Sequence, residues 1–437
     1  MPRIVFMGAG SVEFTKNLLG DILSFPELRD CEIALHDIDP DRLAVAEAMA
    51  RYAASALGAE PRIEAHLDRR RALDGADHVI NMIQVGGHAA TLLDFEIPAA
   101  HGLRQTIGDT LGIGGIFRTL RTVPVMLALG TEMAELCPHA WLLNYTNPMA
   151  MLCWATYAGT PQQRIVGLCH SMQNTTADLA ELVGVPLEEV TFLGAGVNHQ
   201  AFILRFQRGE EDLYPRLDRV IDGDPELRRR VRVEMYRRLG YFPTESSEHS
   251  AEYLPWFMRR DEAIAHFRIP AGEYIARSEE NLQLYEDMRR SLEAGEAIEI
   301  ERSQEYASLI IHSVLTGQER VIYGNVRNDG LITNLPAGAC VEVPCLVDRN
   351  GVQPTIVGDL PPQLAALNRT FLNVCELTVR AALEGRRDHV HHAALLDPSA
   401  AASLSPDAIH AVVEELIDAH GDALPEGIRR GRCVRRP

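Results

Sequence analysis

The sequence lacks an uninterrupted run of about 18 apolar residues, the length that a membrane-spanning helix needs. Its first residues, "MPRIVFMGAG", enter a predicted strand directly and lack the basic and then apolar segments of a secretory signal. The eight cysteines are scattered, with no CxxC pair and no disulfide-framework spacing, which is typical of a reducing compartment. We therefore expect a cytoplasmic protein without a membrane partner.

Positive charge is also scarce relative to negative charge. The formal net charge is −19, which disfavours nucleic acid and anionic membranes as partners but says little about a neutral small substrate. The chain has no internal repeat and no low-complexity segment. Its 437 residues exceed one ordinary domain and predict two or three.

The first half of the chain alternates predicted buried strands with amphipathic helices, which indicates a parallel sheet with helices on both faces. The strands are expected within residues 3–11, 31–39, 78–87, 140–148 and 164–170, and two of the helices within residues 12–26 and 40–58. After about residue 195 the pattern becomes charged, helical and loop-rich. We expect a Rossmann-like domain over residues 1–195, and a packed second α+β domain with a helical C-terminal region over residues 196–437.

The turn "GAGS" at residues 8–11 lies between a predicted strand and a predicted helix. Gly8 and Gly10 match a dinucleotide-binding fingerprint, in which glycines let the backbone approach a pyrophosphate at a helix N-terminus. Glu13 stands where the fingerprint has its third glycine, so a purely structural tight turn is the alternative.

The end of the second strand, "HDID", strengthens the dinucleotide interpretation. Asp37 stands where a carboxylate accepts hydrogen bonds from a ribose diol and repels a 2′-phosphate, which favours NAD over NADP. Asp39 is better placed to cap the helix that begins at Pro40. The expected cofactor-binding residues are Gly8, Gly10, Ser11, Asp37 and Asn81.

Polar side chains follow the next predicted strands at their carboxyl ends, where open parallel sheets bind ligands. Asn144 and Asn147 suit substrate hydroxyls, or alternatively they hold a tight turn. Cys169 and His170 follow the next strand, and His199 lies further on. A thiolate and an imidazole can hold a divalent metal with open positions, although a lone cysteine or histidine is more often structural.

Long segments of the chain resemble the family 4 glycoside hydrolases, the NAD- and metal-dependent glycosidases, and most of all their α-galactosidase branch. The resemblance runs nearly end to end and lies in "GAGS" (8–11), "DFE…HGL.QTIGDTLGIGGIFRTLRTVP" (94–124), "LNYTNPMAM" (143–151), "GLCHS" (167–171), "GVNHQAF" (196–202), "GYFPTESSEHSAEYLPWF" (240–257) and "IYGNVRNDGLITNLP" (322–336). It implies the two-domain architecture of lactate and malate dehydrogenases, with NAD and Mn²⁺ or a similar ion as cofactors.

The resemblance also implies a mechanism: transient oxidation of the sugar at C3, removal of the C2 proton, elimination of the aglycone and return of the hydride. Cys169 and His199 would hold the metal, and Asn147, with Asn144, would bind sugar hydroxyls. His170 would face the substrate and protonate the leaving oxygen, or only bind. Arg277 would line the sugar pocket.

The base that takes the C2 proton is expected in the segment "ESSEHSAEY". Tyr253 is the expected base by position, with Glu248, His249 and Glu252 as alternatives. An unperturbed tyrosine has a pKa of about 10 and needs a nearby cation to act near neutral pH. Asp109 and Arg118 are expected near the cofactor or the metal.

The expected substrate is an α-galactoside, with an α-galacturonide or an α-glucoside as the alternative. Two other functions share the fold: a net NAD-dependent dehydrogenase and a non-catalytic NAD-binding regulator. The metal pair disfavours both. The resemblance further suggests a homodimer or homotetramer.

Overall fold

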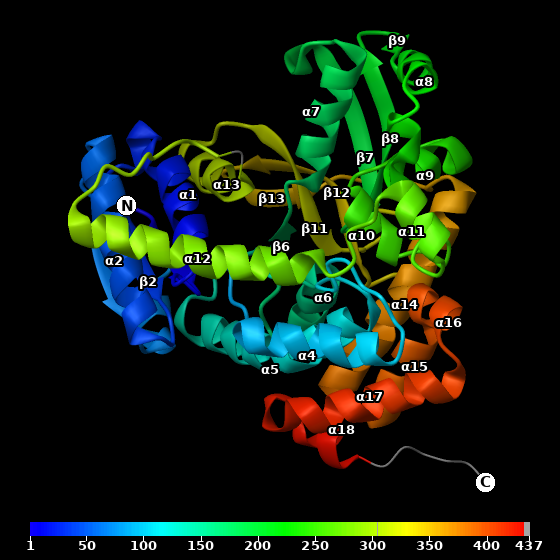
Figure 1. Cartoon of the computed structure of the whole chain (residues 1–437). Coiled ribbons are helices and arrows are strands. Elements are labelled where there is room, and N and C mark those ends of the chain that lie inside the picture. The colour runs from blue at the N-terminus through cyan, green and yellow to red at the C-terminus, as the bar shows by residue number, and fades with distance from the viewer. Residues whose placement is uncertain (304, 432–437) are drawn as a thin grey trace.

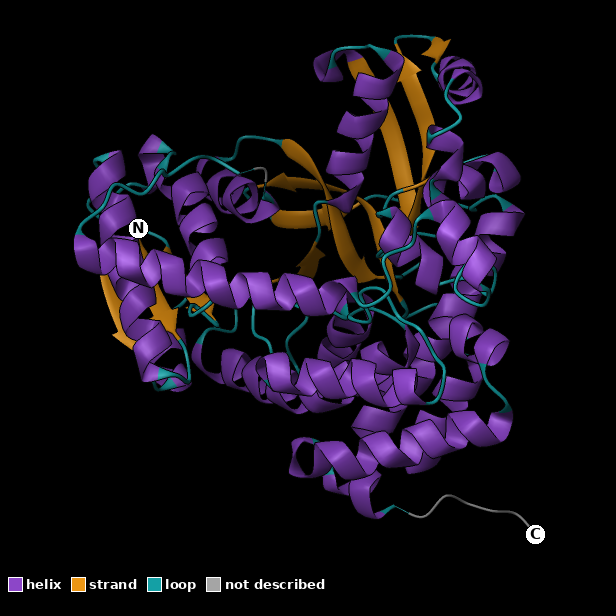
Figure 2. Cartoon of the chain, in the orientation of Figure 1, coloured by secondary structure: helices purple, strands orange, loops and turns teal. Residues whose placement is uncertain are grey.

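The computed structural model describes residues 1–303 and 305–431. Within them, helices surround a 13-stranded sheet (Figures 1 and 2). The strands are β1 Arg3–Met7, β2 Glu32–His36, β3 Arg62–His66, β4 His78–Asn81, β5 Trp141–Asn144, β6 Ile165–Leu168, β7 Val190–Val197, β8 Gln200–Arg208, β9 Glu211–Asp212, β10 Phe242–Pro243, β11 Arg320–Arg327, β12 Cys340–Asp348 and β13 Gly351–Pro354.

Eighteen α-helices are assigned in the same described residues. They are α1 Val12–Leu23, α2 Pro40–Leu57, α3 Arg69–Leu73, α4 Gly87–Ala100, α5 Gly112–Leu136, α6 Met149–Gly159, α7 Ser171–Val183, α8 Tyr214–Gly223, α9 Val231–Leu239, α10 Ser247–Glu252, α11 Asp261–Phe267, α12 Glu273–Ala294, α13 Tyr306–Thr316, α14 Pro362–Glu384, α15 Arg387–Leu396, α16 Pro398–Ser403, α17 Pro406–His420 and α18 Glu426–Arg430.

The first six strands form a parallel sheet in the order β3-β2-β1-β4-β5-β6. This is the order of a Rossmann fold, in which ligands bind beyond the carboxyl ends of the strands where the order reverses. Here the order reverses between β1 and β4. The predicted α/β sheet is therefore present, with β3 as an additional edge strand.

The second half of the chain continues the same sheet with antiparallel strands. β11 pairs with β6 through Gly324 and Asn325, and β12, β7, β8 and β10 follow outward. Residue 195, the predicted domain boundary, lies within β7, and that division of the chain stays a prediction. The consequence for the site is that the β7–β8 turn comes to lie beside the end of β6.

The C-terminal helices pack beneath the first half of the chain. Figure 1 shows α17 and α18 below α4 and α5; α17 contacts α4 and α15 contacts α5, both far apart in sequence. By length and composition α5 is apolar enough to cross a membrane, but 72% of its apolar window is buried inside the protein. This burial identifies α5 as a core helix, lying between the sheet and the C-terminal helices.

Candidate functional site

A cavity of about 780 Å³ opens at the carboxyl ends of β1 and β4, and we call it the β1 cavity. Gly8 has a left-handed φ of 82°, and a Cβ there would lie 3.0 Å from the Ile83 backbone. A Cβ on Gly10 would lie 2.6 Å from Asp37 Oδ2. Both positions therefore need glycine. Ser11, which precedes α1, also lines the cavity.

The two acids after β2 have different contacts, and the predicted cap role of Asp39 is confirmed. Asp39 is the N-cap of α2, and its side chain accepts from the backbone N–H groups of Asp41 and Arg42 at 2.9 and 3.1 Å. Asp37 lines the β1 cavity and accepts from the Gly10 N–H at 2.8 Å. The Asp37 carboxylate thus stands between the glycine turn and the cavity, which fits a nucleotide ribose.

Helix α12 runs across the first half of the chain in Figure 1, and it contacts α1, α2 and α4. One face of it, including Tyr274, Ser278, Tyr285 and Met288, lines the cavity. Along its whole described length, α12 has no buried residue. Ser278 Oγ lies 2.9 Å from His88 Nδ1, and the Tyr285 ring stacks under the Arg42 guanidinium at 4.2 Å. α12 is therefore a cover for the cavity and not part of the core.

Five side chains meet beyond β6, and we call them the Cys169 cluster: Cys169, His199, Glu245, Asp109 and His249. His199 Nε2 lies 3.4 Å from Cys169 Sγ and 3.3 Å from Glu245 Oε2. His249 Nε2 lies 3.5 Å from Asp109 Oδ1. Sulfur, imidazole and carboxylate donors at such distances suit a divalent transition metal.

His199 is held from behind in a fixed orientation. It occupies the two-residue turn between β7 and β8 with a positive φ of 64°, which is uncommon outside glycine and costs free energy. Its Nδ1 lies 2.8 Å from Thr110 Oγ1 and 3.4 Å from the Tyr253 hydroxyl. These contacts leave Nε2 directed toward Cys169 and Glu245.

A chain of polar contacts joins the Cys169 cluster to the β1 cavity. Asn147 Nδ2 donates to Asp109 Oδ2 at 3.1 Å, and Arg118 Nε donates to the Asn147 carbonyl at 3.1 Å. Arg118 Nη1 then donates at 3.0 Å to the hydroxyl of Tyr274, which lines the cavity. The cluster and the cavity are thus two parts of one site.

The pKa values of the acidic groups in the cluster depend on burial and on the charges of their neighbours. Burial and the nearby carboxylate of Glu245 raise the pKa of Cys169 to about 11, so a thiolate here calls for a neighbouring cation. Burial alone would raise the pKa of Asp109, but the hydrogen bond and charge of His249 hold it well below its usual range. The pKa of Glu245 is also lowered, because the His199 and His249 charges outweigh burial.

His170 follows Cys169 and is half exposed. Its Nδ1 lies 3.3 Å from Glu305 Oε1, and this contact raises the pKa of His170 to about 9. With Nδ1 taken by Glu305, Nε2 is the ring nitrogen left for a ligand.

Glu252 organises the loop that carries Asp109. Its carboxylate accepts from the backbone N–H groups of Thr106, Ile107 and Gly108, at 2.8, 3.3 and 2.9 Å. Burial nevertheless raises the pKa of Glu252 to about 7. Glu252 is therefore occupied with the backbone and is not available as a base.

Two predicted site residues, Asn144 and Arg277, lie differently from expectation. The Asn144 amide is fully buried and bonds Thr146 and the Asn81 side chain, so it is not directed to a ligand. Asn81 lines the β1 cavity, as a cofactor-binding residue should, but its amide nitrogen bonds inside the protein, and its role stays a prediction. Arg277 is exposed on α12 and ion-pairs with Glu273, away from both the cavity lining and the cluster.

Tyr253 also departs from its predicted role. It is buried behind His199, with its ring against Phe371, and burial raises its pKa well above the ordinary value. Its hydroxyl supports His199 Nδ1, on the side away from Cys169. Sequence reasoning missed Glu245, Thr110 and Glu305. Glu245 begins the segment "ESSEHSAEY", whose density of polar side chains was a local signal for a site. Thr110 and Glu305 had no such signal in the sequence.

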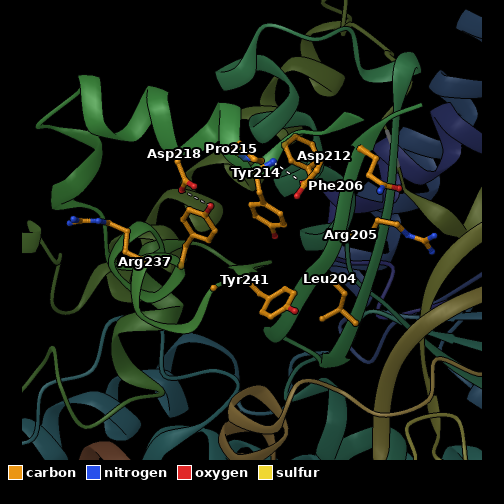
Figure 3. A pocket seen from close by; sticks show the side chains of 12 residues that line it. Leu204, Arg205, Phe206, Asp212, Tyr214, Pro215, Asp218, Arg237 and Tyr241 are labelled. Atoms are coloured by element: carbon orange, nitrogen blue, oxygen red, sulfur yellow. Dashed lines mark hydrogen bonds between the residues drawn. The ribbon is translucent and has the colours of Figure 1, made fainter. Parts of the chain in front are cut away.

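A second cavity, of about 630 Å³, lies between β8, α8 and α9 (Figure 3). Two of its three tyrosines form hydrogen bonds within the fold: Tyr236 donates to Asp218 at 2.7 Å, and Tyr214 donates to the Ile203 carbonyl at 2.6 Å. None of the predicted site residues lines this cavity.

Two family models match the chain, the family 4 glycosyl hydrolase over residues 3–185 and the family 4 glycosyl hydrolase C-terminal domain over residues 194–400. The chain belongs to family 4 of the glycosyl hydrolases. Similar family members are an alpha-galactosidase of Bacillus subtilis, 44% identical over 98% of this chain and all of that one, and an alpha-galactosidase of Rhizobium meliloti, 36% identical over 97% and 89%. An alpha-glucosidase of Erwinia rhapontici is 30% identical over 90% and 93%.

Solved structures confirm the predicted fold class. A 6-phospho-alpha-glucosidase from gut microorganisms, in complex with NAD and Mn²⁺, superposes with a TM-score of 0.81 at 20% identity, over 97% of this chain and 99% of that one. Lactate dehydrogenase from Eimeria maxima superposes with a TM-score of 0.53 at 15% identity, over 87% and 95%. The dehydrogenase-like architecture is therefore shared.

Proposed function

We propose that this family 4 glycosyl hydrolase cleaves α-galactosides with NAD and a divalent metal such as Mn²⁺. The substrate is supported by the two similar alpha-galactosidases, both over nearly the full chain. The single observation that carries the chemistry is the approach of Cys169 Sγ to His199 Nε2, at 3.4 Å, beside a glycine-lined cavity. A cytoplasmic location and a homodimer or homotetramer stay predictions.

The residues present fit both groups. Gly8, Gly10 and Asp37 form a turn and a carboxylate suited to a dinucleotide, and Cys169 and His199, with Glu245 beside them, offer metal donors. When bound, NAD accepts and returns a hydride, and the metal stabilises negative charge on sugar oxygens.

Asn147 is proposed to bind a sugar hydroxyl. Its Oδ1 is buried and has no hydrogen-bond partner among the described residues, while its Nδ2 is fixed on Asp109. A buried amide oxygen left unpaired costs free energy, which a substrate hydroxyl would recover.

His170 is proposed to protonate the leaving oxygen from Nε2. Its Nδ1 contact with Glu305 orients the ring and favours the doubly protonated form. The proton comes from the His170 imidazolium, and water later supplies the hydroxyl that replaces the aglycone.

The base is the catalytic role for which the proposal departs from the sequence prediction. Tyr253 is assigned to holding His199, and His249, in its neutral form, is proposed to take the proton at sugar C2. Support for His249 is the position of its Nε2, 3.5 Å from Asp109 Oδ1 within the Cys169 cluster. Glu252 is bound to backbone N–H groups.

The test is release of p-nitrophenol from its α-galactoside under reducing conditions, after metal and nucleotide have been stripped. NAD⁺ and Mn²⁺ are added back singly and together. Turnover only with both, without net NADH, is expected. Turnover without NAD⁺ contradicts the mechanism, and accumulating NADH indicates a dehydrogenase. The matched α-glucoside and α-galacturonide decide the sugar, since the 30% identical relative is an alpha-glucosidase.

A further inference from the structure

We propose that His420, at the C-terminal end of the chain, is a positioning residue for the β1 cavity and acts on it through Asp94 and Arg121. We call these three residues the Arg121 triad. The inference rests on the proposed NAD site for its functional consequence, but its structural step is independent of any ligand.

The Arg121 triad is buried throughout and joins three helices. His420 Nε2 on α17 lies 2.9 Å from Asp94 Oδ1 on α4, and Asp94 Oδ2 lies 2.7 Å from Arg121 Nη2 on α5. The side chains are between 0% and 3% exposed. Because such a pair is costly to desolvate, each member depends on the geometry of the others.

The far end of the triad reaches the cavity wall. Arg121 Nε donates to the Val85 carbonyl at 3.0 Å. Val85 and the next three residues line the β1 cavity; Val85 and Gly86 form the turn that leads into α4, and Gly87 and His88 begin that helix. The two turn residues lie outside β4 and α4, and Gly86 has a left-handed φ of 83°, which glycine adopts without a side chain to fix it. The Arg121 guanidinium supplies that constraint.

His420, the other end of the triad, lies in a part of the chain that follows the last residue matched by the family models. The C-terminal domain model ends at residue 400, whereas α17 spans Pro406–His420. The His420 ring also stacks on Phe117 of α5, with ring centroids 5.6 Å apart. Helix α17 is thus fastened to the helices that carry both the cavity turn and the loop of Asp109.

Loss of the His420 imidazole removes one of the two partners that the Asp94 carboxylate has among the described residues. The Asp94 carboxylate and the Arg121 guanidinium are then free to shift toward each other or toward water. The Arg121–Val85 contact shifts with them, which loosens the turn at residues 85–88. The expected result is weaker NAD⁺ binding with little change in the chemical step.

A matched control exists on the same two helices. His101, at the C-terminal end of α4, lies 2.8 Å from Glu415 Oε2 on α17. That pair is partly exposed and does not contact Arg121. Glu415→Gln therefore weakens the same helix packing without touching the triad. His420→Gln is the conservative variant, because its amide N–H reaches the region of Nε2.

The experiment compares full-length wild type, His420→Leu, His420→Gln and Glu415→Gln. Hydrogen–deuterium exchange is followed in peptides covering residues 83–91, and KM for NAD⁺ and kcat are measured with Mn²⁺ present. We expect His420→Leu to speed hydrogen exchange in these peptides and to raise KM for NAD⁺ about tenfold, while kcat stays within about twofold of wild type. The reason is that the change displaces a group that binds the cofactor but leaves the reacting atoms in place.

His420→Gln is expected to restore most of both values, and Glu415→Gln to match wild type. Unchanged exchange at residues 83–91 in His420→Leu, or equal changes in Glu415→Gln, would overturn the inference. If wild type itself shows no dependence on NAD⁺, the proposed function fails, while the exchange comparison still decides whether His420 holds the turn.

Discussion

The two parts of the site are built on different principles. The glycine turn of the β1 cavity and its acids come from neighbouring segments of chain, and Asp37 and Asp39 bond the backbone within that same turn region. The Cys169 cluster draws its members from four separate segments, and three of them, Asp109, His199 and His249, are buried. The first part is fixed by backbone conformation and the second by long-range packing.

This difference teaches where each part is vulnerable. A backbone-built binding site tolerates side-chain changes and fails when backbone space is lost. A cluster of buried charges fails when one member is removed, because the others are left unpaired. The following changes test that contrast, beginning with the largest expected effect.

Cys169→Ala is expected to lower kcat on the order of a thousandfold, because a metal donor and its charge stabilisation are lost. Metal content and steady-state rates measure the effect, and NAD⁺ binding is expected to stay within about twofold of wild type. Cys137→Ala, at the end of α5 and outside the cluster, is the control. A variant that keeps both metal and turnover would contradict the assignment of Cys169.

Asp397→Asn tests a buried carboxylate that holds the start of α5. Asp397 accepts from the Ala400 N–H at 2.8 Å and from the Gly112 N–H, and burial raises its pKa from 3.8 to about 6. A raised pKa favours the protonated folded form, so its contribution is present below pH 3.8 and is lost as pH rises through 6.

The wild-type free energy of unfolding, relative to Asp397→Asn, should therefore fall by roughly 3 kcal/mol from low to neutral pH. Urea unfolding at a series of pH values measures it. Asparagine keeps an acceptor oxygen for the same N–H groups, so parallel pH profiles of the two proteins would exclude the effect.

Gly10→Ala is expected to weaken NAD⁺ binding about tenfold, because displacing Asp37 loses roughly one hydrogen bond's worth of free energy. A Cβ at this position would lie 2.6 Å from Asp37 Oδ2 and 2.7 Å from Arg42 Cβ. Calorimetric titration measures it, and metal binding should be unaffected. Gly223→Ala is the control, since a Cβ there meets nothing within 4 Å.

The smallest effects concern the helix caps of the two parts. Asp39→Ala should lower the free energy of unfolding by about 1 kcal/mol, since two cap bonds of α2 are lost. Ser246→Ala should cost less stability, because its one cap bond to the His249 N–H is 3.4 Å long, but it should lower kcat by loosening α10. Equal losses of kcat in Asp39→Ala and Ser246→Ala would contradict the difference drawn here between the β1 cavity and the Cys169 cluster.

The sequence was sufficient for the parts that depend on local pattern. Apolar runs located the five strands of the parallel sheet that are buried, and Asp39 was assigned correctly as the cap of α2, while the ribose role of Asp37 stays a prediction. β3 was not predicted, because "RIEAH" is a half-exposed edge strand without an apolar run. The pairing of Cys169 with His199 came from family resemblance, since no spacing rule relates ligands 30 residues apart.

The remaining site residues depend on information that a single sequence does not carry. Asn144 stands at a strand end, but side chains there alternate between faces, and its amide is directed to Asn81 instead of a ligand. Tyr253 lies in the expected segment of the chain, but in space its hydroxyl contacts His199 Nδ1, on the side of the ring away from Cys169. His420 and Asp94 are 326 residues apart, and no local pattern links them.

Helix α12 has a consequence for how the protein holds its cofactor. A helix of 22 residues with no buried side chain gains little from its own packing, and its inner face looks onto the cavity. A dinucleotide in that cavity would serve as the missing core beneath the helix. Ordering of α12 and retention of that dinucleotide would then be one equilibrium, and the dinucleotide would act as a structural element beneath the helix.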